Sequence, residues 1–578
     1  MTTRRRNARR EAIWSAIVLL GFFVLGARLA MLALGSQDRV SAKTQTVSLM
    51  PERGALYDRN GVELAKSLHF ADIAVYARNI GEIRPYSAWL APRVGVPEHK
   101  LVEMFSKPGA GRVVIARKMP IDRALAIVRE YNAASRNDKA FYRSRGPLDL
   151  EEYALRELPQ GNLAIQVLGL TKFERADMKV VPLCGLEKQF DKALSGTKGV
   201  MEGAKDRHGT WQLSSMQQRK EPVDGSPLQL SIDSRIQQVV ETALDTACKA
   251  HQPEDAVAIV LDPKTGEILA MASRPTIASP AERRAPADVH KLVNRATRLQ
   301  LEPGSIHKTL VMAAALEEGL LGENEGFYCS GTRKIGNSKV GCALHGGKRA
   351  HGKLNSEGVL AQSCNVSMAI LGQRLGPEGL YNWADKFGLL AKTGIEFPNE
   401  KQGIMYRPEK WVHARALQCA VVSFGQGFSA TPIGIAAAYG AIANDGIWVQ
   451  PTLLKRDVPP QGRQAISPHT AATVRQWLRA AVEKGTGKSG AHIKGFALGG
   501  KTGTAEVSAP GKGYLEGQYT ASFVGLVPAD NPTAVVLVML HKPKGAYYGG
   551  TVAAPVFREI AQFLLVYQRS SPLVASNY

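Results

Sequence analysis

The chain is short of acidic residues, and beyond its first 35 residues it has no second long apolar run. Its 578 residues hold 51 Asp and Glu against 73 Lys and Arg, a formal net charge of +22. Such an excess favours anionic surroundings such as nucleic acid, acidic lipid or an acidic polymer. Neither Cys/His finger spacing nor an aromatic ribonucleoprotein motif occurs, so no nucleic-acid partner is predicted.

The first 35 residues combine a basic start with an apolar run. Five arginines between positions 4 and 10 precede a nearly unbroken apolar stretch over residues 12–34. About 20 apolar residues cross a bilayer core as a helix, and a basic flank keeps its end in the cytoplasm. A cleaved signal peptide has a similar charged start but a shorter apolar core. The sequence therefore predicts a basic cytoplasmic tail over residues 1–11, one transmembrane anchor over residues 12–34, and an extracytoplasmic remainder.

Cysteine is also scarce, with six residues in the chain. Cys329 and Cys342 flank one short loop that contains Gly and Lys, so an exported chain can pair them as a disulfide. His345 and His351 follow closely, which makes a zinc site the alternative. Because the spacing matches no standard zinc-ligand pattern, the disulfide is preferred and no metal site is predicted.

Apolar periodicity divides the remainder into two domains. Residues 35–225 are mixed and loop-rich. After them, apolar strands at 256–261 and 268–272 flank a Pro/Gly turn, which predicts a β-hairpin. Helical patterns dominate residues 305–444, strand patterns return at 496–540, and residues 552–567 predict a closing helix. Strands at both ends with helices between them predict one mixed α/β domain over residues 226–570, followed by a tail over 571–578.

The first of three short chemical motifs in this domain is Ser305-Ile306-His307-Lys308. Pro303 and Gly304 before the serine, and apolar residues after it, predict that Ser305 lies at a helix N-terminus. Backbone N–H groups there favour the negative charge that develops during acyl transfer. Lys308 follows one turn later, where its neutral amine can take the serine proton. Acylation should then slow as pH falls through a lowered lysine pKa.

The other two motifs are Ser363-Cys364-Asn365 and Lys501-Thr502-Gly503, followed by Thr504. Ser363 offers a hydroxyl relay between Lys308 and a leaving amine, and Asn365 offers an amide that holds both Lys308 and a substrate carbonyl. Residues 496–500 predict an edge strand whose glycines let a peptide approach closely. The segment of Thr502, Gly503 and Thr504 is the predicted substrate-binding segment, where the threonines bind a carboxylate and Lys501 adds positive charge.

Each motif is weak alone, because copies of it recur elsewhere in the chain. Ser-x-x-Lys recurs at residues 195–198, Ser-x-Asn at 135–137, and Lys-Thr-Gly at both 264–266 and 392–394. Ser195 lies in a Gly-broken turn, Lys264 at a hairpin tip, and Lys392 before a loop. The set at 305, 363 and 501 has the order and the helix-start, loop and strand contexts that the chemistry needs.

This ordered set, with Glu302-Pro303-Gly304 before the serine and Gly500 before the third motif, resembles the transpeptidase domain of penicillin-binding proteins. The segments 53–61 and 185–188 are similar to the non-catalytic pedestal of class B members. Arg28 in the anchor and the segments 547–550 and 553–557 are similar to the cell-division subgroup. The resemblance implies a β-lactamase-like fold, a five-stranded antiparallel sheet flanked by helices. Leu301, where many members have Phe, and the cysteine loop 329–342 depart from the pattern.

The resemblance also implies a function, that of a peptidoglycan D,D-transpeptidase in septal wall synthesis. Ser305 would be acylated by a stem peptide with release of D-alanine, over an oxyanion hole formed by the N–H groups of Ser305 and Thr504. No cofactor is implied, and β-lactams would trap Ser305 as an ester. The implied partners are a SEDS-type glycan polymerase and other divisome proteins, at the bacterial cytoplasmic membrane with the N-terminus inside.

The same residues disfavour several other functions and leave some open. No Glu-Asp-x-x-Phe setting for glycan polymerisation and no Glu-x-x-Leu-Asn segment for β-lactam hydrolysis occurs. A class B enzyme of elongation or sporulation remains an alternative, as does a D,D-carboxypeptidase, which passes the same acyl-enzyme to water. A non-catalytic β-lactam sensor or wall-binding scaffold is disfavoured, because binding alone does not require the intact set of Ser305, Lys308, Ser363, Asn365 and Lys501.

Overall fold

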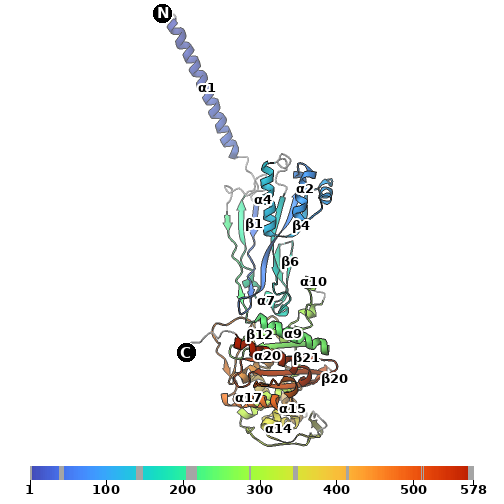
Figure 1. The fold of residues 1–578 in the computed structure, drawn as a ribbon. Helices are drawn as coiled ribbons and strands as arrows, with labels where there is room; N and C mark the ends of the chain where they lie inside the picture. Colours follow the sequence, from blue (N-terminus) through green and yellow to red (C-terminus); the bar gives the residue numbers. More distant parts are fainter. Residues whose placement is uncertain are drawn as a thin grey trace. The chain divides into compact units, whose positions relative to one another are not determined.

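The computed structural model describes most of the chain (Figure 1): residues 3–37, 45–137, 148–176, 178–203, 218–284, 288–342, 349–411, 415–509, 511 and 513–570. His345 and the predicted tail over 571–578 lie outside the described residues. The chain divides into two compact units. The first comprises Met1–Glu52, His69–Tyr153 and Gly196–Asp224, and the second comprises Arg53–Leu68, Ala154–Ser195 and Gly225–Tyr578. Both units therefore draw on the sequence predicted as the pedestal, and the boundary at residue 225 stays a prediction.

The N-terminal helix α1 (Thr3–Gln37) contains the predicted anchor. Its segment Ile13–Met31 has a mean hydropathy of 2.0 and is unburied. Among the described residues this is the one helix that is long and apolar enough to cross a membrane. Length and hydropathy thus agree with a single span.

The first unit contains a three-stranded antiparallel sheet and a small α/β core. The sheet has the order β1 (Gln45–Leu49), β8 (Gly199–Gly203) and β9 (Gln218–Lys220). The core packs the second half of β3 (Glu63–Tyr76) and its partner β4 (Arg112–Pro120) with α2 (Ile83–Val94), α3 (Glu98–Ser106) and α4 (Ile121–Asn137). Tyr86, Leu90 and Leu101 are at most 2% exposed in it, so this part has an apolar core of its own.

The second unit is built on a five-stranded antiparallel sheet. Its strand order is β12 (Ile268–Arg274), β11 (Asp255–Leu261), β21 (Ala534–His541), β20 (Gly513–Val527) and β19 (Gly499–Ala509). The predicted hairpin forms β11 and β12, and the distant C-terminal strands complete the sheet beside it. The predicted mixed α/β fold with a five-stranded antiparallel sheet is therefore confirmed.

Helices cover both faces of this sheet (Figure 1). Successive residues of β11 point to opposite faces, so Val257, Ile259 and Leu261 join one apolar core while Ala256, Ala258 and Val260 join another. The second core contains α9 (Ser234–His251) and α20 (Ala554–Ser570). The first contains α12 (His307–Glu317), α14 (Asn365–Lys386), α15 (Arg415–Ser423), α16 (Pro432–Ala443) and α17 (Pro468–Glu483).

Shorter elements connect these layers in the second unit. They are β2 (Leu56–Tyr57), α6 (Ile165–Leu168), β6 (Thr171–Glu174), β7 (Lys179–Pro182), α7 (Gly185–Gln189), α8 (Asp191–Leu194), β10 (Leu228–Gln229), α10 (Pro280–Arg284), α11 (Arg295–Arg298), β13 (Phe327–Cys329), β14 (Thr332–Ile335), β15 (Ser338–Gly341), β16 (Gly352–Leu354), α13 (Ser356–Ala361), β17 (Ile447–Trp448), β18 (Arg463–Gln464), α18 (Lys488–Ala491) and α19 (Gly549–Val552). Strand β5 (Leu148–Glu157) pairs with β3.

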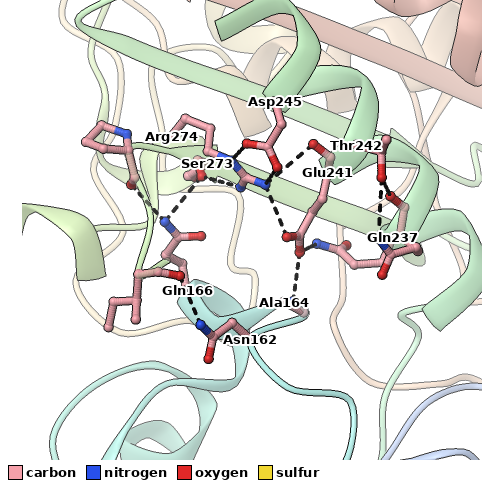
Figure 2. A network of polar contacts seen from close by, with 12 residues as sticks. Asn162, Ala164, Gln166, Gln237, Glu241, Thr242, Asp245, Ser273 and Arg274 are labelled. Carbon is pink, nitrogen blue, oxygen red and sulfur yellow. Dashed lines mark hydrogen bonds and ion pairs between the residues drawn. The ribbon is translucent and has the colours of Figure 1, made fainter. Parts of the chain in front are cut away.

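A polar network fastens α6 to the edge of the sheet beside α9 (Figure 2). The Gln166 amide donates to the carbonyls of Ser273 and Pro275 at 3.2 and 3.0 Å. Glu241 on α9 accepts from the backbone N–H of Ala164 at 2.8 Å and pairs with Arg274 at the end of β12. Because these buried polar groups have partners, the segment before β6 can pack against the sheet without leaving unsatisfied groups.

Candidate active site

Ser305 lies where the sequence predicts it, in a tight turn that leads into a helix. The 3-10 turn Gly304–Ile306 runs directly into α12. Gly304 has φ +58°, its N–H donates to the Gly425 carbonyl at 2.8 Å, and a Cβ there would lie 2.8 Å from that of Ala505. Only glycine fits that conformation so close to β19. The close approach brings β19 beside the start of α12, and Ser305 itself is half-buried.

Lys308 is the residue that joins the first motif to the second. Its side chain is fully buried, and its Nζ contacts the Ser363 carbonyl at 2.8 Å, the Ser363 Oγ at 3.1 Å and the Asn365 Oδ1 at 2.5 Å. Ser363 adopts φ +55°, a left-handed conformation that is uncommon for serine. That turn between α13 and α14 presents both of its oxygens to the lysine. The predicted grouping of Lys308, Ser363 and Asn365 is present in the structure.

Burial changes the acid–base behaviour of Lys308. Loss of solvent lowers the pKa of Lys308 to about 8, although the nearby Cys364 and Cys342 thiols oppose the shift. A lysine with this pKa is neutral in a substantial fraction of molecules just above neutral pH, and only the neutral amine can accept a proton. The environment therefore equips Lys308 to act as a base toward a neighbouring hydroxyl.

The third motif lies inside β19, which corrects the predicted position of this strand. The sequence places an edge strand at 496–500, ahead of Lys501, whereas β19 begins at Gly499 and contains the whole motif. The strand starts later because Phe496 closes a turn on Ile493, with its N–H donating to that carbonyl at 3.2 Å. The motif is therefore part of the sheet itself, and no further strand pairs with β19 in the described sheet.

Lys501 is fully buried, and its Nζ donates to the Thr502 carbonyl at 3.0 Å. Burial, with a further contribution from the charge of Lys308, holds the pKa of Lys501 well below its usual range. The predicted positive charge is thus disfavoured in the free site. A substrate carboxylate nearby would favour it, because an opposite charge stabilises the protonated form.

Close packing explains the small residues around the third motif. A Cβ on Gly503 would lie 2.2 Å from the Ser522 Oγ, and one on Gly500 would lie 2.5 Å from the ring of Phe523. The two threonines are held by neighbours: Thr502 Oγ1 lies 2.7 Å from Thr486 Oγ1, and Thr504 Oγ1 accepts from the Gly549 N–H at 3.1 Å. The hydroxyl positions are fixed before any ligand binds.

The three motifs meet at one cavity of about 1210 Å³. Ser305, Ser363, Asn365, Thr502 and Thr504 line it, and the buried Lys308 and Lys501 adjoin them. The cavity also has a lining that the motifs do not predict: Lys339, Val340, Gly341, Cys342, Leu417, Phe424, Thr486, His492, Tyr519, Tyr547 and Tyr548. Of these, Tyr519 and Tyr547 are stacked with ring centroids 4.3 Å apart.

Most of the unpredicted lining carries no sequence signal of its own. Tyr547 and Tyr548 belong to a segment that resembles the cell-division subgroup, and Cys342 belongs to the loop that departs from the family pattern. Thr486, by contrast, lies in an unremarkable turn after α17, and only the folded structure brings it to the cavity, where it contacts Thr502.

The cysteine loop differs from the sequence-based prediction. Cys329 and Cys342 lie together, but both are free thiols with their Sγ atoms 3.6 Å apart, whereas a disulfide bond measures about 2.05 Å. Cys364, from the second motif, is a third thiol beside them, with its Sγ 3.7 Å from that of Cys342. The loop brings the predicted pair together and adds a third sulfur that sequence spacing does not relate to them.

A hydroxyl at a helix start, a buried amine within a serine and asparagine network, and an open strand edge are the parts of a serine acyl-transfer site. Residues 256–562 match the penicillin binding protein transpeptidase domain, and residues 48–230 match the penicillin-binding protein dimerisation domain. The chain belongs to the penicillin-binding protein transpeptidase family, and this combination of domains is that of the class B members.

Individual relatives agree with this assignment over nearly the whole chain. Stage V sporulation protein D of Bacillus subtilis is 32% identical over 552 residues, which cover 93% of this chain and 81% of that protein. The peptidoglycan D,D-transpeptidase FtsI of Escherichia coli is 29% identical over 567 residues, covering 95% and 90%. The crystal structure of penicillin binding protein 3 of Mycobacterium tuberculosis, complexed with aztreonam, superposes with a TM-score of 0.66 at 27% identity, covering 91% and 98%. The predicted class of enzyme, a serine-type D,D-transpeptidase, is confirmed.

Proposed function

We propose that the chain cross-links peptidoglycan during septal wall synthesis through an acyl-enzyme on Ser305. The observation that supports the acyl-enzyme most directly is the burial of Lys308. Its amine lies one helical turn from Ser305 in the sequence and contacts both Ser363 and Asn365. A lysine kept in a dry site at a lowered pKa suits proton transfer, and a lysine retained for charge or solubility would lie on the surface.

In the first step, the Ser305 Oγ attacks the carbonyl carbon of the penultimate D-alanine of a stem peptide. The serine proton passes to the neutral amine of Lys308, and the N–H groups of Ser305 and Thr504 stabilise the oxyanion that forms. The C–N bond then breaks, and the leaving D-alanine takes the proton through the Ser363 hydroxyl. This step leaves an ester on Ser305, free D-alanine and a neutral Lys308.

In the second step, an amine of a neighbouring stem peptide attacks the ester carbonyl. Lys308 takes a proton from the incoming amine and returns it to the Ser305 Oγ as the ester bond breaks. The product is a new amide, and the serine is regenerated. Before the terminal D-alanine leaves in the first step, Thr502 and Thr504 bind its carboxylate while the donor peptide lies along the open edge of β19.

The arrangement of the chain supports a site of action outside the membrane. With the arginines of the N-terminus held in the cytoplasm, α1 crosses the cytoplasmic membrane once and leaves the catalytic domain on the outer side. A septal partner follows from the same layout, because a chain without polymerase motifs needs another protein to supply glycan strands. We assign that role to a SEDS-type glycan polymerase acting with other divisome proteins.

Labelling with a fluorescent penicillin tests the catalytic assignment. Full-length protein in detergent should form a stable covalent adduct with one molecule of label per chain, and Ser305→Ala should form none while retaining the fold. An adduct that disappears within minutes would instead indicate hydrolysis. A folded wild-type chain that takes no label would overturn the proposal.

A second assay distinguishes transfer of the acyl group to an amine from its hydrolysis by water. With a synthetic stem peptide and a D-amino acid as acceptor, we expect an exchanged peptide, whereas a carboxypeptidase gives only the shortened peptide.

Depletion in the native bacterium should block septation while the cells continue to elongate. Rounded cells on depletion would assign the enzyme to elongation, and failure to co-purify with the polymerase would remove the proposed partner.

A further inference from the structure

We infer that the three thiols of Cys329, Cys342 and Cys364, with the imidazole of His351, form a tetrahedral zinc site beside the active site. One ligand atom from each of these residues lies within 4.8 Å of every other. They come from different elements: the end of β13, the residue after β15, the residue before β16 and the residue before α14. Three thiolates and one imidazole are a common ligand set of structural zinc.

The spacing of the ligand atoms fits a metal ion at their centre. With Zn–S bonds of about 2.3 Å and Zn–N bonds of about 2.0 Å, tetrahedral geometry separates two sulfurs by about 3.8 Å and a sulfur from a nitrogen by about 3.5 Å. The observed separations are 3.6 Å between the sulfurs of Cys329 and Cys342, and 3.7 Å between those of Cys342 and Cys364. The Sγ of Cys329 lies 3.5 Å from the Nδ1 of His351.

A disulfide accounts for this arrangement less well. A bond between Cys329 and Cys342 would draw their sulfurs together by more than 1 Å and leave the third thiol and the imidazole without a role. A tetrahedral metal ion requires four ligand atoms around one point, and the three sulfurs and the imidazole nitrogen supply them. Soft thiolates with imidazole in this geometry favour zinc over the oxygen-seeking magnesium and calcium ions.

The backbone around the sulfurs is arranged to support thiolates. The N–H groups of Gly331, Val366 and Ser367 point at the sulfurs of Cys329, Cys342 and Cys364 respectively, each at 3.4 Å. The Ser367 hydroxyl donates to the Cys364 sulfur at 3.3 Å. Such donors stabilise the negative charge of metal-bound thiolates and orient them.

The site would position the second catalytic motif. Cys364 separates Ser363 from Asn365, so fixing its sulfur restrains both of the residues that hold Lys308. On the other side, Cys342 follows Gly341, whose carbonyl accepts from the Asn365 amide at 2.8 Å. The loop and the motif form two walls of one cavity, and a shared metal ion would bind these walls to one another.

Metal analysis of full-length protein in detergent, purified without chelator, tests the inference directly. We expect one zinc per chain, and six titratable thiols after denaturation with a chelator. Replacement by Co²⁺ should give the intense thiolate absorption and visible bands of a tetrahedral cobalt site. Four thiols without zinc would show the disulfide, and six thiols without zinc in folded protein would show free cysteines. Either result overturns the site.

Variants separate a ligand from a residue that only packs. His351→Ala should lower zinc affinity at least about tenfold, because even the outer partners of metal ligands contribute that much. His351→Cys should restore binding as a four-thiolate site. Cys248→Ser, which removes a thiol on α9 outside the cluster, should keep one zinc. Unchanged zinc affinity in His351→Ala would exclude His351 as a ligand.

Penicillin labelling keeps this test separate from that of the proposed function. A zinc-depleted protein whose fold is retained should label more slowly than the zinc-loaded protein and recover when zinc is added back. Full zinc occupancy with no labelling would uphold the metal site and contradict the catalytic proposal.

Discussion

The same short motifs occur in this chain in two environments, and the lysines show the difference. In the cavity, Lys308 of Ser-x-x-Lys and Lys501 of Lys-Thr-Gly are fully buried. In the other copies, Lys198, Lys264 and Lys392 are exposed. Identical sequence letters therefore acquire different chemistry, because burial shifts a lysine toward its neutral form and exposure leaves it solvated.

The exposed copies have local structural roles. In the turn between β11 and β12, the N–H groups of Lys264 and Thr265 donate to the Asp262 carboxylate at 2.9 and 3.3 Å. In the Lys-Thr-Gly copy at residues 392–394, the Thr393 hydroxyl donates to the Glu400 carboxylate at 2.6 Å. The tripeptide suits turns as well as an active-site strand, and long-range packing decides which use it has.

The contrast between buried and exposed lysines can be tested by substitution, and the largest effect is expected at Lys308. Lys308→Ala should slow acylation by penicillin on the order of 10³-fold, the loss typical of a general base. Its exposed counterpart, Lys198→Ala, should label at the wild-type rate. The comparison is a stopped-flow or gel-based rate of label incorporation. A decrease of less than about tenfold in Lys308→Ala would show that another group takes the serine proton.

A smaller loss is expected at the second buried lysine. Lys501→Ala should slow acylation about 10²-fold, since it removes a donor beside the carboxylate subsite without removing the base. Lys264→Ala carries the same change in the same tripeptide and should leave both labelling and stability unchanged to within about 0.5 kcal/mol. Equal effects of the two substitutions would refute the distinction by burial.

The pH dependence of acylation sharpens the comparison further. Because the pKa of Lys308 is lowered to about 8, most Lys308 side chains carry a proton at pH 6 and about half carry one at pH 8. The acylation rate should therefore rise roughly 50-fold between pH 6 and pH 8 and level off above that. Lys264→Ala should follow the same curve. A rate that stays constant over this range would exclude a titrating Lys308 as the base.

The sequence predicts the features that are determined by residues close together in the chain. The β11–β12 hairpin, the helix start at Ser305 and the order of the three motifs depend on local turn chemistry and spacing. The sequence places this strand at 496–500, ahead of the start of β19 at Gly499, because glycines at 499 and 500 are compatible with a strand end as well as a strand interior. Distant residues hold them in the strand: the ring of Phe523 packs against Gly500, and Leu478 and Ala529 pack against Gly499.

The features that escaped prediction depend on contacts between distant segments. Cys364 is 22 residues from its nearest sulfur neighbour, so no spacing rule relates the two. The contact of Thr486 with Thr502 requires the end of α17 to lie beside β19, which only the folded sheet provides. Motifs locate the reacting groups, while the tertiary structure selects the residues that hold them.

The smallest expected effect concerns a buried histidine between the two catalytic residues of the first motif. His307 is 3% exposed, its ring packs on Phe428 with centroids 4.7 Å apart, and within the described structure neither ring nitrogen has a hydrogen-bond partner. Burial lowers the pKa of His307 to about 3. The folded protein thus holds the imidazole neutral, whereas the unfolded chain protonates it near pH 6.5.

Above about pH 6.5 the imidazole is neutral in both the folded and the unfolded chain, so the free energy of unfolding has its full value. As pH falls from 6.5 toward 3, the unfolded chain gains a proton that the folded protein, with its depressed pKa, does not, and the free energy of unfolding decreases. Between pH 7 and pH 5, the wild type should lose about 2 kcal/mol of unfolding free energy relative to His307→Leu, which cannot titrate. Denaturant unfolding at the two pH values measures the difference. If the curves of the wild type and His307→Leu stayed parallel, His307 would have to gain a proton without cost in the folded state, and the dry environment inferred for the start of α12 would be wrong.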